Sequence, residues 1–461
     1  MSNINLKQIL YDQLDELFLG DITKKGESFE TTSSVLQLLP LGQHIYKKDY
    51  ENPVTLSAYD KGNMGSSENL SLLVNDIPKA SIEFSASGNL ETLYRQLITG
   101  ATPSKVVELT DEQKEQYNNA QSVLYEEVTK TIKGKEVTIK ENTQSYLDYE
   151  DALEEYDDAI EELETAKLDY DLTDSSDQRR WQIAAKKLNR AVSKAQKNLE
   201  KYKDVDDALK IIRATCTNAI AAVLADEKDQ FKNSEIVSLG SGPSWHICYA
   251  YPSNWYENDD MYSHLVIKEE HKKDSKSSKF FNLSADVSLN FGIFSTKDSV
   301  DYKKEEKHEE SQTDATSISM DVAVVQIKRP WLNESLFTLP NWQINGILRA
   351  YYSDGTFLTK DKNNQLKANS GCIPLIPKSF VIVKNVVISG NFTQDNLEFI
   401  KQQTELGYDV GIGPFKISGK SSFGDQKEDH AYEADSKSIT IDNPQIIGFI
   451  SSVVPLCPQN E

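Results

Sequence analysis

Apolar residues recur at alternating spacings of three and four in two consecutive segments between residues 145 and 203, and this periodicity constrains the fold most. The spacing places apolar side chains along one stripe of a helix, in the heptad pattern of coiled coils. The two stripes consist of Tyr146, Tyr149, Leu153, Tyr156, Ile160 and Leu163, with Tyr170 two turns later, and of Trp181, Ala185, Leu188, Val192, Ala195, Leu199 and Tyr202. Only the short polar stretch 173–177 separates them. The sequence therefore predicts a long, antiparallel, coiled-coil-like helical hairpin at about residues 145–203.

The charges of this segment are sorted by sign. Twelve acidic residues and one basic residue lie between Ser145 and Asp171, whereas nine basic and two acidic residues lie between Asp177 and Lys203. Each arm alone would repel itself, but side by side the flanking charges can pair across the seam. This sorting supports the hairpin and indicates that much of its charge is satisfied internally.

The predicted hairpin belongs to a larger helical domain at residues 111–231. Tyr117, Leu124 and Val128 share one face of an expected first helix. A further helix, from about residue 205 to 231, is more apolar and is expected to pack the base of the hairpin.

From residue 236 to 458 the sequence is typical of β-structure, because runs of β-branched and aromatic residues alternate with Gly, Pro, Asn and Asp. The expected strands include residues 379–389, 413–418, 438–441 and 446–454. Residues 1–110 are mixed and are expected to contribute strands to the same body. The predicted class is α+β: an antiparallel β-sandwich-like body built from residues 1–110 and 236–458, with the helical hairpin domain inserted.

Two amphipathic strands are expected at residues 283–293 and 317–325. Their apolar positions, which alternate with polar ones, are Leu283, Ala285, Val287, Leu289, Phe291 and Ile293, and Ile318, Met320, Val322 and Val324. Each strand has about the length, roughly 9–11 residues, that crosses a bilayer when tilted. Apolar-out and polar-in alternation is typical of such strands, but equally of a soluble sheet with one face on a core. We treat them as candidate membrane-insertion strands and keep the soluble interpretation open.

An aromatic segment follows residue 244. Its candidate ligand-binding or partner-binding residues are Trp245, Tyr251, Trp255 and Tyr256. Exposed aromatic side chains beside polar groups can stack on sugar rings or anchor at a membrane surface. Aromatic residues of a β core or of a subunit contact would have the same pattern, so both interpretations stay open.

Charge and hydropathy exclude or disfavour several classes of protein. The net charge of −22 argues against a nucleic-acid binder, which needs a basic surface to displace counterions. No run approaches the roughly 18–20 apolar residues of a membrane-spanning helix. The first residues form an expected amphipathic helix, without the basic start and apolar core of a classical signal peptide. We expect synthesis in the cytoplasm and leave export by another route open.

The motifs give no support to an enzyme or a cofactor protein. The six histidines and four cysteines show no metal-ligand spacing, and no Gly-x-Ser-x-Gly element is present. The segment Gly413–Ser421 resembles a phosphate loop, but it has one residue too many between its glycines. The sequence therefore predicts no catalytic residue, no metal and no cofactor, although a pair of catalytic carboxylates among so many acidic residues is not excluded.

These observations favour a non-enzymatic interaction protein, with a protein partner or self-association through the helical arm. The most specific version of this hypothesis is a membrane-active, pore-forming-toxin-like protein that inserts the strand pair after a conformational change. The alternatives are a carbohydrate-binding protein or glycan-acting hydrolase that uses the aromatic segment, and a structural component of a larger assembly.

Overall fold

The computed structural model describes residues 6–19, 32–54, 62–103, 110–132, 135–168, 175–236, 244–268, 292–296, 307–311, 314–339, 342–360, 366–418 and 432–459. Its contacts divide the chain into two compact units: Met1–Ala101 with Ser234–Glu461, and Thr102–Asn233. We call them the first and the second unit. The second unit thus interrupts the first in sequence. Helices and an antiparallel main sheet occur together, so the α+β class is confirmed.

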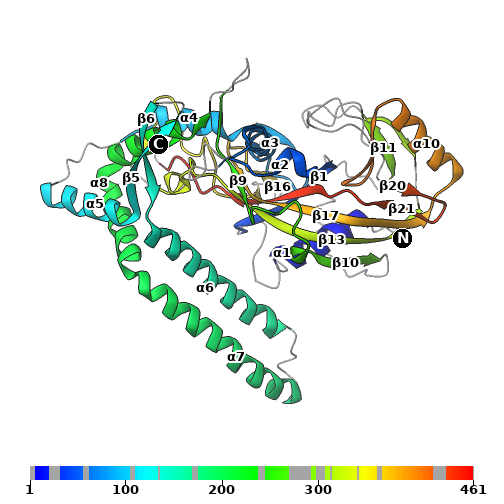
Figure 1. Cartoon of the computed structure of the whole chain (residues 1–461), viewed down its shortest axis with the longest axis horizontal. Coiled ribbons are helices and arrows are strands. Elements are labelled where there is room, and N and C mark those ends of the chain that lie inside the picture. Colours follow the sequence, from blue (N-terminus) through cyan, green and yellow to red (C-terminus); the bar gives the residue numbers. More distant parts are fainter. Residues whose placement is uncertain are drawn as a thin grey trace. The chain divides into compact units, whose positions relative to one another are not determined.

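The main sheet of the first unit is antiparallel (Figure 1). Its path runs β1 (Ser34–His44), β22 (Gln445–Val453), β17 (Leu375–Asn391), β13 (Asp314–Lys328) and β10 (Ser263–Lys268), with β9 (Tyr249–Tyr251) also on β13, β21 (Ser438–Ile441) on β17, and β20 (Tyr432–Ala434) on β21. A second sheet has the order β12 (Lys307–Ser311), β11 (Ile293–Thr296), β18 (Asp409–Ile412) and β19 (Phe415–Ser418). The main sheet pairs strands that are about four hundred residues apart in sequence, and the second sheet pairs strands that are about one hundred residues apart.

Shorter elements complete the first unit. The strands are β2 (Asp76–Pro78), β3 (Ala86–Asn89), β7 (Glu235–Ile236), β8 (Trp245–His246), β14 (Trp342–Gln343), β15 (Leu358–Lys360) and β16 (Leu366–Ala368). The helices are α1 (Leu6–Leu19), α2 (Lys47–Tyr50), α3 (Met64–Val74), α4 (Leu90–Gly100), η3 (Asp259–Met261), η4 (Glu334–Phe337) and α10 (Gln394–Glu405). Polar caps fix several helix starts: the side chains of Asn63, Asn89 and Thr393 accept hydrogen bonds from the first turns of α3, α4 and α10.

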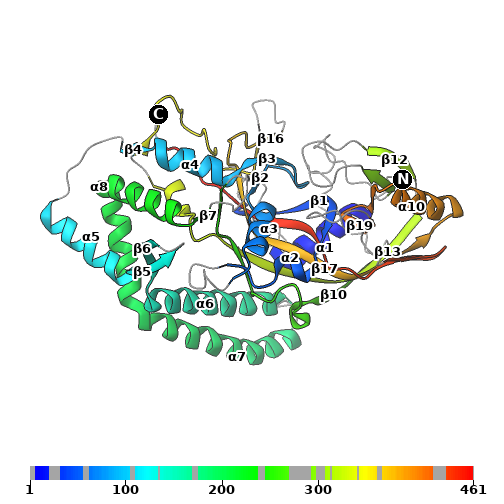
Figure 2. The same cartoon turned by 45° about the horizontal axis from the view of Figure 1, so that its top comes forward.

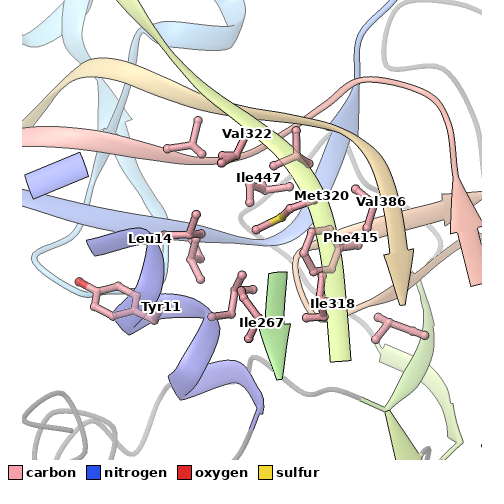
Figure 3. Packing of buried hydrophobic residues seen from close by; sticks show 14 of the residues in the cluster. Tyr11, Leu14, Ile267, Ile318, Met320, Val322, Val386, Phe415 and Ile447 are labelled. Carbon is pink, nitrogen blue, oxygen red and sulfur yellow. The ribbon is translucent and has the colours of Figure 1, made fainter. Parts of the chain in front are cut away.

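One hydrophobic core takes side chains from both sheets and from α1 (Figure 3). Leu10 and Leu14 of α1 have no exposed surface, and the Tyr11 hydroxyl donates to the Leu36 carbonyl at 3.0 Å. Ile318, Met320 and Val322 of β13 point into the same cluster, as do Phe415 of β19 and Ile447 of β22. The expected N-terminal amphipathic helix is therefore α1, and its apolar stripe is part of the core.

The second unit is mostly helical (Figures 1 and 2). It consists of β4 (Thr102–Pro103), α5 (Asp111–Leu124), β5 (Tyr125–Ile132), β6 (Lys135–Asn142), α6 (Gln144–Leu168), α7 (Ser175–Leu199), η2 (Glu200–Tyr202) and α8 (Lys203–Asn233). Helices α6 and α7 contact each other, and a small core of Ala120, Leu124, Val205 and Ala208 joins α5 to α8.

One expectation for this unit is wrong. A helix was expected to continue through Val128, but the chain leaves α5 at Leu124 and forms the antiparallel pair β5–β6. Residues 125–132 and 135–142 contain several β-branched residues, which favour strands because their side chains pack well on a pleated surface. Local β propensity thus outweighs the apolar spacing that had suggested a helix.

Candidate functional site

Of the two expected amphipathic strands, the structure describes the second in full and only the last two residues of the first, and these parts lie in different sheets. Ile318, Met320 and Val322 of β13 are fully buried, and Val324 is half-buried. Ile293 is also fully buried, but it belongs to β11, which pairs with β12 and β18. The other residues of the first strand, namely Leu283, Val287, Leu289 and Phe291, lie outside the described residues. From Ser317 to Val322, therefore, the alternation produces a strand with one face on the core, whereas Ala323 and Val325 on the other face are also buried.

The aromatic segment contributes mainly to packing. Trp255 is 1% exposed, and its ring lies 4.9 Å from that of Phe380 and 5.4 Å from that of Tyr50. Trp245 is also buried, in a small cluster that includes Ile247.

Two aromatic side chains of this segment reach solvent. Tyr251 is 56% exposed, and Tyr256 is half-buried with its ring 5.8 Å from that of Trp255. Of the four candidate residues, Tyr251 alone presents a largely open aromatic surface to a ligand.

On the face of the main sheet opposite the core, a serine and an aspartate of β13 contact a histidine of the neighbouring strand β10. Ser319 and Asp321 are two residues apart and therefore point to the same side of the strand. On β10, His264 lies directly opposite Asp321 in the antiparallel register. His264 Nδ1 lies 2.8 Å from Asp321 Oδ1, and His264 Nε2 lies 3.4 Å from Ser319 Oγ. With Nδ1–H donating to the carboxylate, Nε2 of the neutral ring is an acceptor for the serine hydroxyl.

A β-bulge in β17 holds the aspartate of this array. Between Ser319 and Asp321 the partner position on β17 moves from Val387 to Lys384, which leaves one extra residue in β17. Asn385 within this bulge adopts φ of +52°, a conformation that few residues other than glycine adopt. Its Nδ2 donates to Asp321 Oδ2 at 2.7 Å.

Electrostatics favour the charged form of this aspartate. The hydrogen bond from Asn385, and then that from His264, lowers the pKa of Asp321 below its ordinary value. The nearby Lys384 acts in the same direction, although it also forms an ion pair with Asp259 and lies 4.2 Å from the ring centroid of Tyr262. Asp321 is thus a fixed carboxylate that orients the imidazole.

A second polar cluster is buried and joins helices to the main sheet. Asn75 Nδ2 donates to Glu91 Oε1 at 2.6 Å, and Arg329 Nε donates to Asn75 Oδ1 at 2.9 Å. Nη1 of Arg329 also donates to the Pro377 carbonyl at 2.6 Å, and His246 Nδ1 lies 3.2 Å from Glu91 Oε2. Burial lowers the pKa of Arg329. Because these groups are buried and hydrogen-bonded to one another or to backbone carbonyls, the cluster connects the end of α3, α4, β8, the end of β13 and β17 rather than facing a ligand.

In the second unit, α6 and α7 line a cavity of about 950 Å³. Its basic lining residues come from α7 and, for the last of them, from the adjoining η2; they are spaced by four, three and four and so follow one face of this helical segment. They are Arg190, Lys194, Lys197 and Lys201. Alanine side chains at positions 159, 191 and 195 and the Glu155 carboxylate complete much of the wall. Asn198 Nδ2 donates to Glu155 Oε2 at 3.0 Å across the two helices. We call this feature the cationic groove.

The serine–histidine–aspartate array has no motif in the sequence that predicts it. The alternation at 317–325 placed Ser319 and Asp321 on one face, but the pairing of His264 with that strand has no local sequence signal. The basic stripe of α7 was visible in the sequence, whereas the cavity beside it was not.

No group of three or more potential metal ligands occurs among the described residues. Within the same residues, no helix is both long enough and apolar enough to span a membrane. Comparisons with protein-family models, with curated proteins and with solved structures gave no match.

Proposed function

We propose that this chain is an interaction protein that self-associates through its helical arm, the antiparallel hairpin of α6 and α7. The observation that carries the proposal is the cationic groove, a cavity of about 950 Å³ with four basic side chains along one wall. Its alanine floor leaves room for a third helix to approach closely. An acidic helix is the natural occupant, because its carboxylates would pair with the stripe on α7.

The acidic arm of a second copy fits this description. Ten of the twelve acidic residues between 145 and 171 lie in α6 (Gln144–Leu168), with one basic residue, so α6 of one copy matches the groove of the other in charge. On α6, Leu147 lies outside the apolar stripe of the hairpin and is 41% exposed, which gives the helix an apolar side chain to bury on docking. If each copy offers its α6 to the groove of the other, the contact is reciprocal and closes as a two-fold dimer.

The experiment is sedimentation velocity on the full chain over a range of protein and salt concentrations. The groove variant Lys194→Glu/Lys201→Glu reverses two lining charges and is expected to weaken dimerisation at least about 10-fold, equivalent to about 1.4 kcal/mol. The matched control, Lys186→Glu/Lys187→Glu, makes the same charge change at exposed positions of α7 that do not line the cavity. It should dimerise like the unmodified protein. A chain that stays monomeric throughout, or equal losses in both variants, would refute self-association through the groove.

Membrane insertion is a second candidate function, favoured by the alternation at residues 317–324 and by the length of β13. The strand spans Asp314–Lys328, more than the roughly 9–11 residues that a tilted membrane strand needs. Because Ile318, Met320 and Val322 are fully buried, insertion would require β13 to leave β10 and β17 first. Dye release from anionic lipid vesicles, measured from pH 4.5 to 7.5, tests this function. Absence of release and of membrane-bound oligomers at every pH would eliminate it.

The arrangement of the first unit is also part of the proposal. Because one core cluster contains side chains from both sheets of this unit, we infer that the two sheets are the layers of a sandwich-like body.

Carbohydrate binding has less support than self-association. Trp245 and Trp255 are buried, which removes two of the four aromatic side chains that could stack on a sugar ring.

A further inference from the structure

We propose that Ser319, His264 and Asp321 form a hydrolytic site for small carboxylic esters on the outer face of the main sheet. This inference is independent of the self-association proposed above, because all three residues lie in the first unit. It assigns to Ser319 the role of nucleophile, to His264 that of general base and acid, and to Asp321 that of a positioning residue.

The geometry places the hydroxyl, the imidazole and the carboxylate in the consecutive contacts that this chemistry needs. The distances are 3.4 Å from Ser319 Oγ to His264 Nε2 and 2.8 Å from His264 Nδ1 to Asp321 Oδ1. The order of contacts, hydroxyl to Nε2 and Nδ1 to carboxylate, is that of a serine-hydrolase triad, which is recognised by geometry rather than by sequence position. The serine–histidine contact is longer than an ideal hydrogen bond, as is common before substrate binds.

The surroundings of Asp321 distinguish this array from an ordinary row of polar surface residues. Its second oxygen accepts a hydrogen bond of 2.7 Å from Asn385, which lies in a bulge and has a positive φ. Bulges and strained backbone positions are frequent beside active sites, where they aim particular side chains. The carboxylate is therefore held at both oxygens, and the imidazole is held by the carboxylate.

The open position of the array points to small substrates. The His264 side chain is 63% exposed, so an ester can approach Nε2 and Oγ from solvent. Val266 lies directly opposite Ser319 in the register and is 39% exposed, and it offers an apolar contact to a short acyl chain. The expected substrates are accordingly esters of short-chain carboxylic acids.

The reaction proceeds in two balanced halves. Ser319 Oγ attacks the carbonyl carbon while its proton passes to His264 Nε2, and the π electrons move to the carbonyl oxygen. When the tetrahedral intermediate collapses, the C–O bond to the alcohol breaks and Nε2 returns its proton to the leaving oxygen. Water, deprotonated by the same nitrogen, then attacks the acyl-serine, the carbon–Oγ bond breaks, and Ser319 regains its proton. One ester and one water give one acid and one alcohol.

The test combines turnover with covalent labelling of the full chain. 4-Nitrophenyl acetate and butyrate report hydrolysis, and a fluorophosphonate probe followed by peptide mapping reports the nucleophile. We expect the label on Ser319, and we expect Ser319→Ala and His264→Gln to reduce the rate above buffer by at least about 100-fold. Asp321→Asn should lower kcat while leaving KM nearly unchanged, because its role is to orient the base.

Ser317→Ala is the matched control. Ser317 lies on the same strand and the same face, but its partner on β10 is Lys268 rather than a histidine. Its loss should change neither labelling nor turnover. If the unmodified protein takes no label at Ser319, or if Ser319→Ala hydrolyses both esters at the unmodified rate, the assignment is overturned. Mapping the label on unmodified protein decides the matter even where a variant fails to fold.

Discussion

At the scale of single residues, the ion pair between Lys416 and Asp409 gives the sharpest stability prediction. Lys416 Nζ lies 3.2 Å from Asp409 Oδ1, and the two side chains are 1% and 4% exposed. Replacement of Lys416 by an apolar residue takes its charged partner away from the buried Asp409 carboxylate. Lys416→Met is therefore expected to lower the free energy of unfolding by about 3–5 kcal/mol. Urea denaturation followed by tryptophan fluorescence measures it, since four of the five tryptophans belong to the first unit.

An exposed lysine in the same unit provides the comparison for this prediction. Lys401 is 74% exposed and lies 4.0 Å from Glu405 on α10. Because surface pairs contribute about 0–1 kcal/mol, Lys401→Met should leave the urea midpoint nearly in place. The same loss in both lysine variants would contradict the importance of burial at Lys416.

Asp321 gives a pH-dependent prediction whose sign follows from its lowered pKa. Its charged form is favoured by folding, so this stabilisation is complete above the ordinary aspartate pKa of about 3.9. It is lost as the pH falls through the lower pKa of the folded protein. Asn385→Gly keeps the positive φ accessible but removes the main cause of the shift, and it should raise the pKa of Asp321.

Titration of the Asp321 carboxyl carbon by NMR measures this change. The control Asn391→Gly alters the exposed end of the same strand, where it pairs with Asp314, and should leave the titration unchanged. An Asp321 pKa that is identical in the Asn385→Gly variant and the unmodified protein would disprove the assigned role of the amide.

The residue scale also shows why the candidate site could be predicted only in part. Period-two alternation places Ser319 and Asp321 on one face without any structure. His264 joins them only through the register of β10 on β13, between segments more than fifty residues apart. Register depends on the fit of whole strand faces to the core and is not encoded in a short motif.

At the scale of single elements, α10 has a complete capping box. Thr393 accepts a hydrogen bond from the Asn396 backbone, while the Asn396 side chain accepts one from the Thr393 backbone. Thr393→Ala should therefore destabilise the first unit by about 0.5–2 kcal/mol. Urea denaturation tests this value, and Thr393→Ser, which retains the hydroxyl, should recover most of the loss. If the serine variant is as unstable as the alanine variant, the cap is not the cause.

Elements with strong local signals were predicted well. The expected strand 438–441 is β21 with the same bounds, and the expected strand 446–454 is β22 shifted by one residue. The heptad stripes correspond to α6 and α7, although the side chains of Ile160, Leu163 and Trp181 and the whole of Tyr170 lie outside the described residues. The pair β5–β6 was not predicted, because Val128 continues the helical spacing of Tyr117 and Leu124 and so extended the expected helix over the β-branched residues that follow it.

At the scale of the whole molecule, net charge should govern self-association. With a net charge of −22 at pH 7, two copies repel each other at long range even where their arms match. Lowering the pH from 7.5 to about 5.5 brings the chain towards its pI near 4.8 while leaving most carboxylates ionised. The dimer population should therefore rise over this interval, as sedimentation velocity can measure. A dimer population that falls over this interval would contradict the control of self-association by net charge.

The pairing of β1 with β22 determines when the main sheet can be completed during synthesis of the chain. Val35 lies opposite Ser451, so the first strand of the main sheet meets its neighbour only after more than four hundred further residues have been synthesised. At translation rates of roughly 5–20 residues per second, that interval lasts roughly 20 to 80 seconds. The second unit is contiguous in sequence and can fold on the ribosome meanwhile. During this interval the backbone groups of β1 lack their β22 partner and its apolar side chains lack the complete core. A nascent chain stalled before residue 445 should therefore depend on chaperones far more than a finished one.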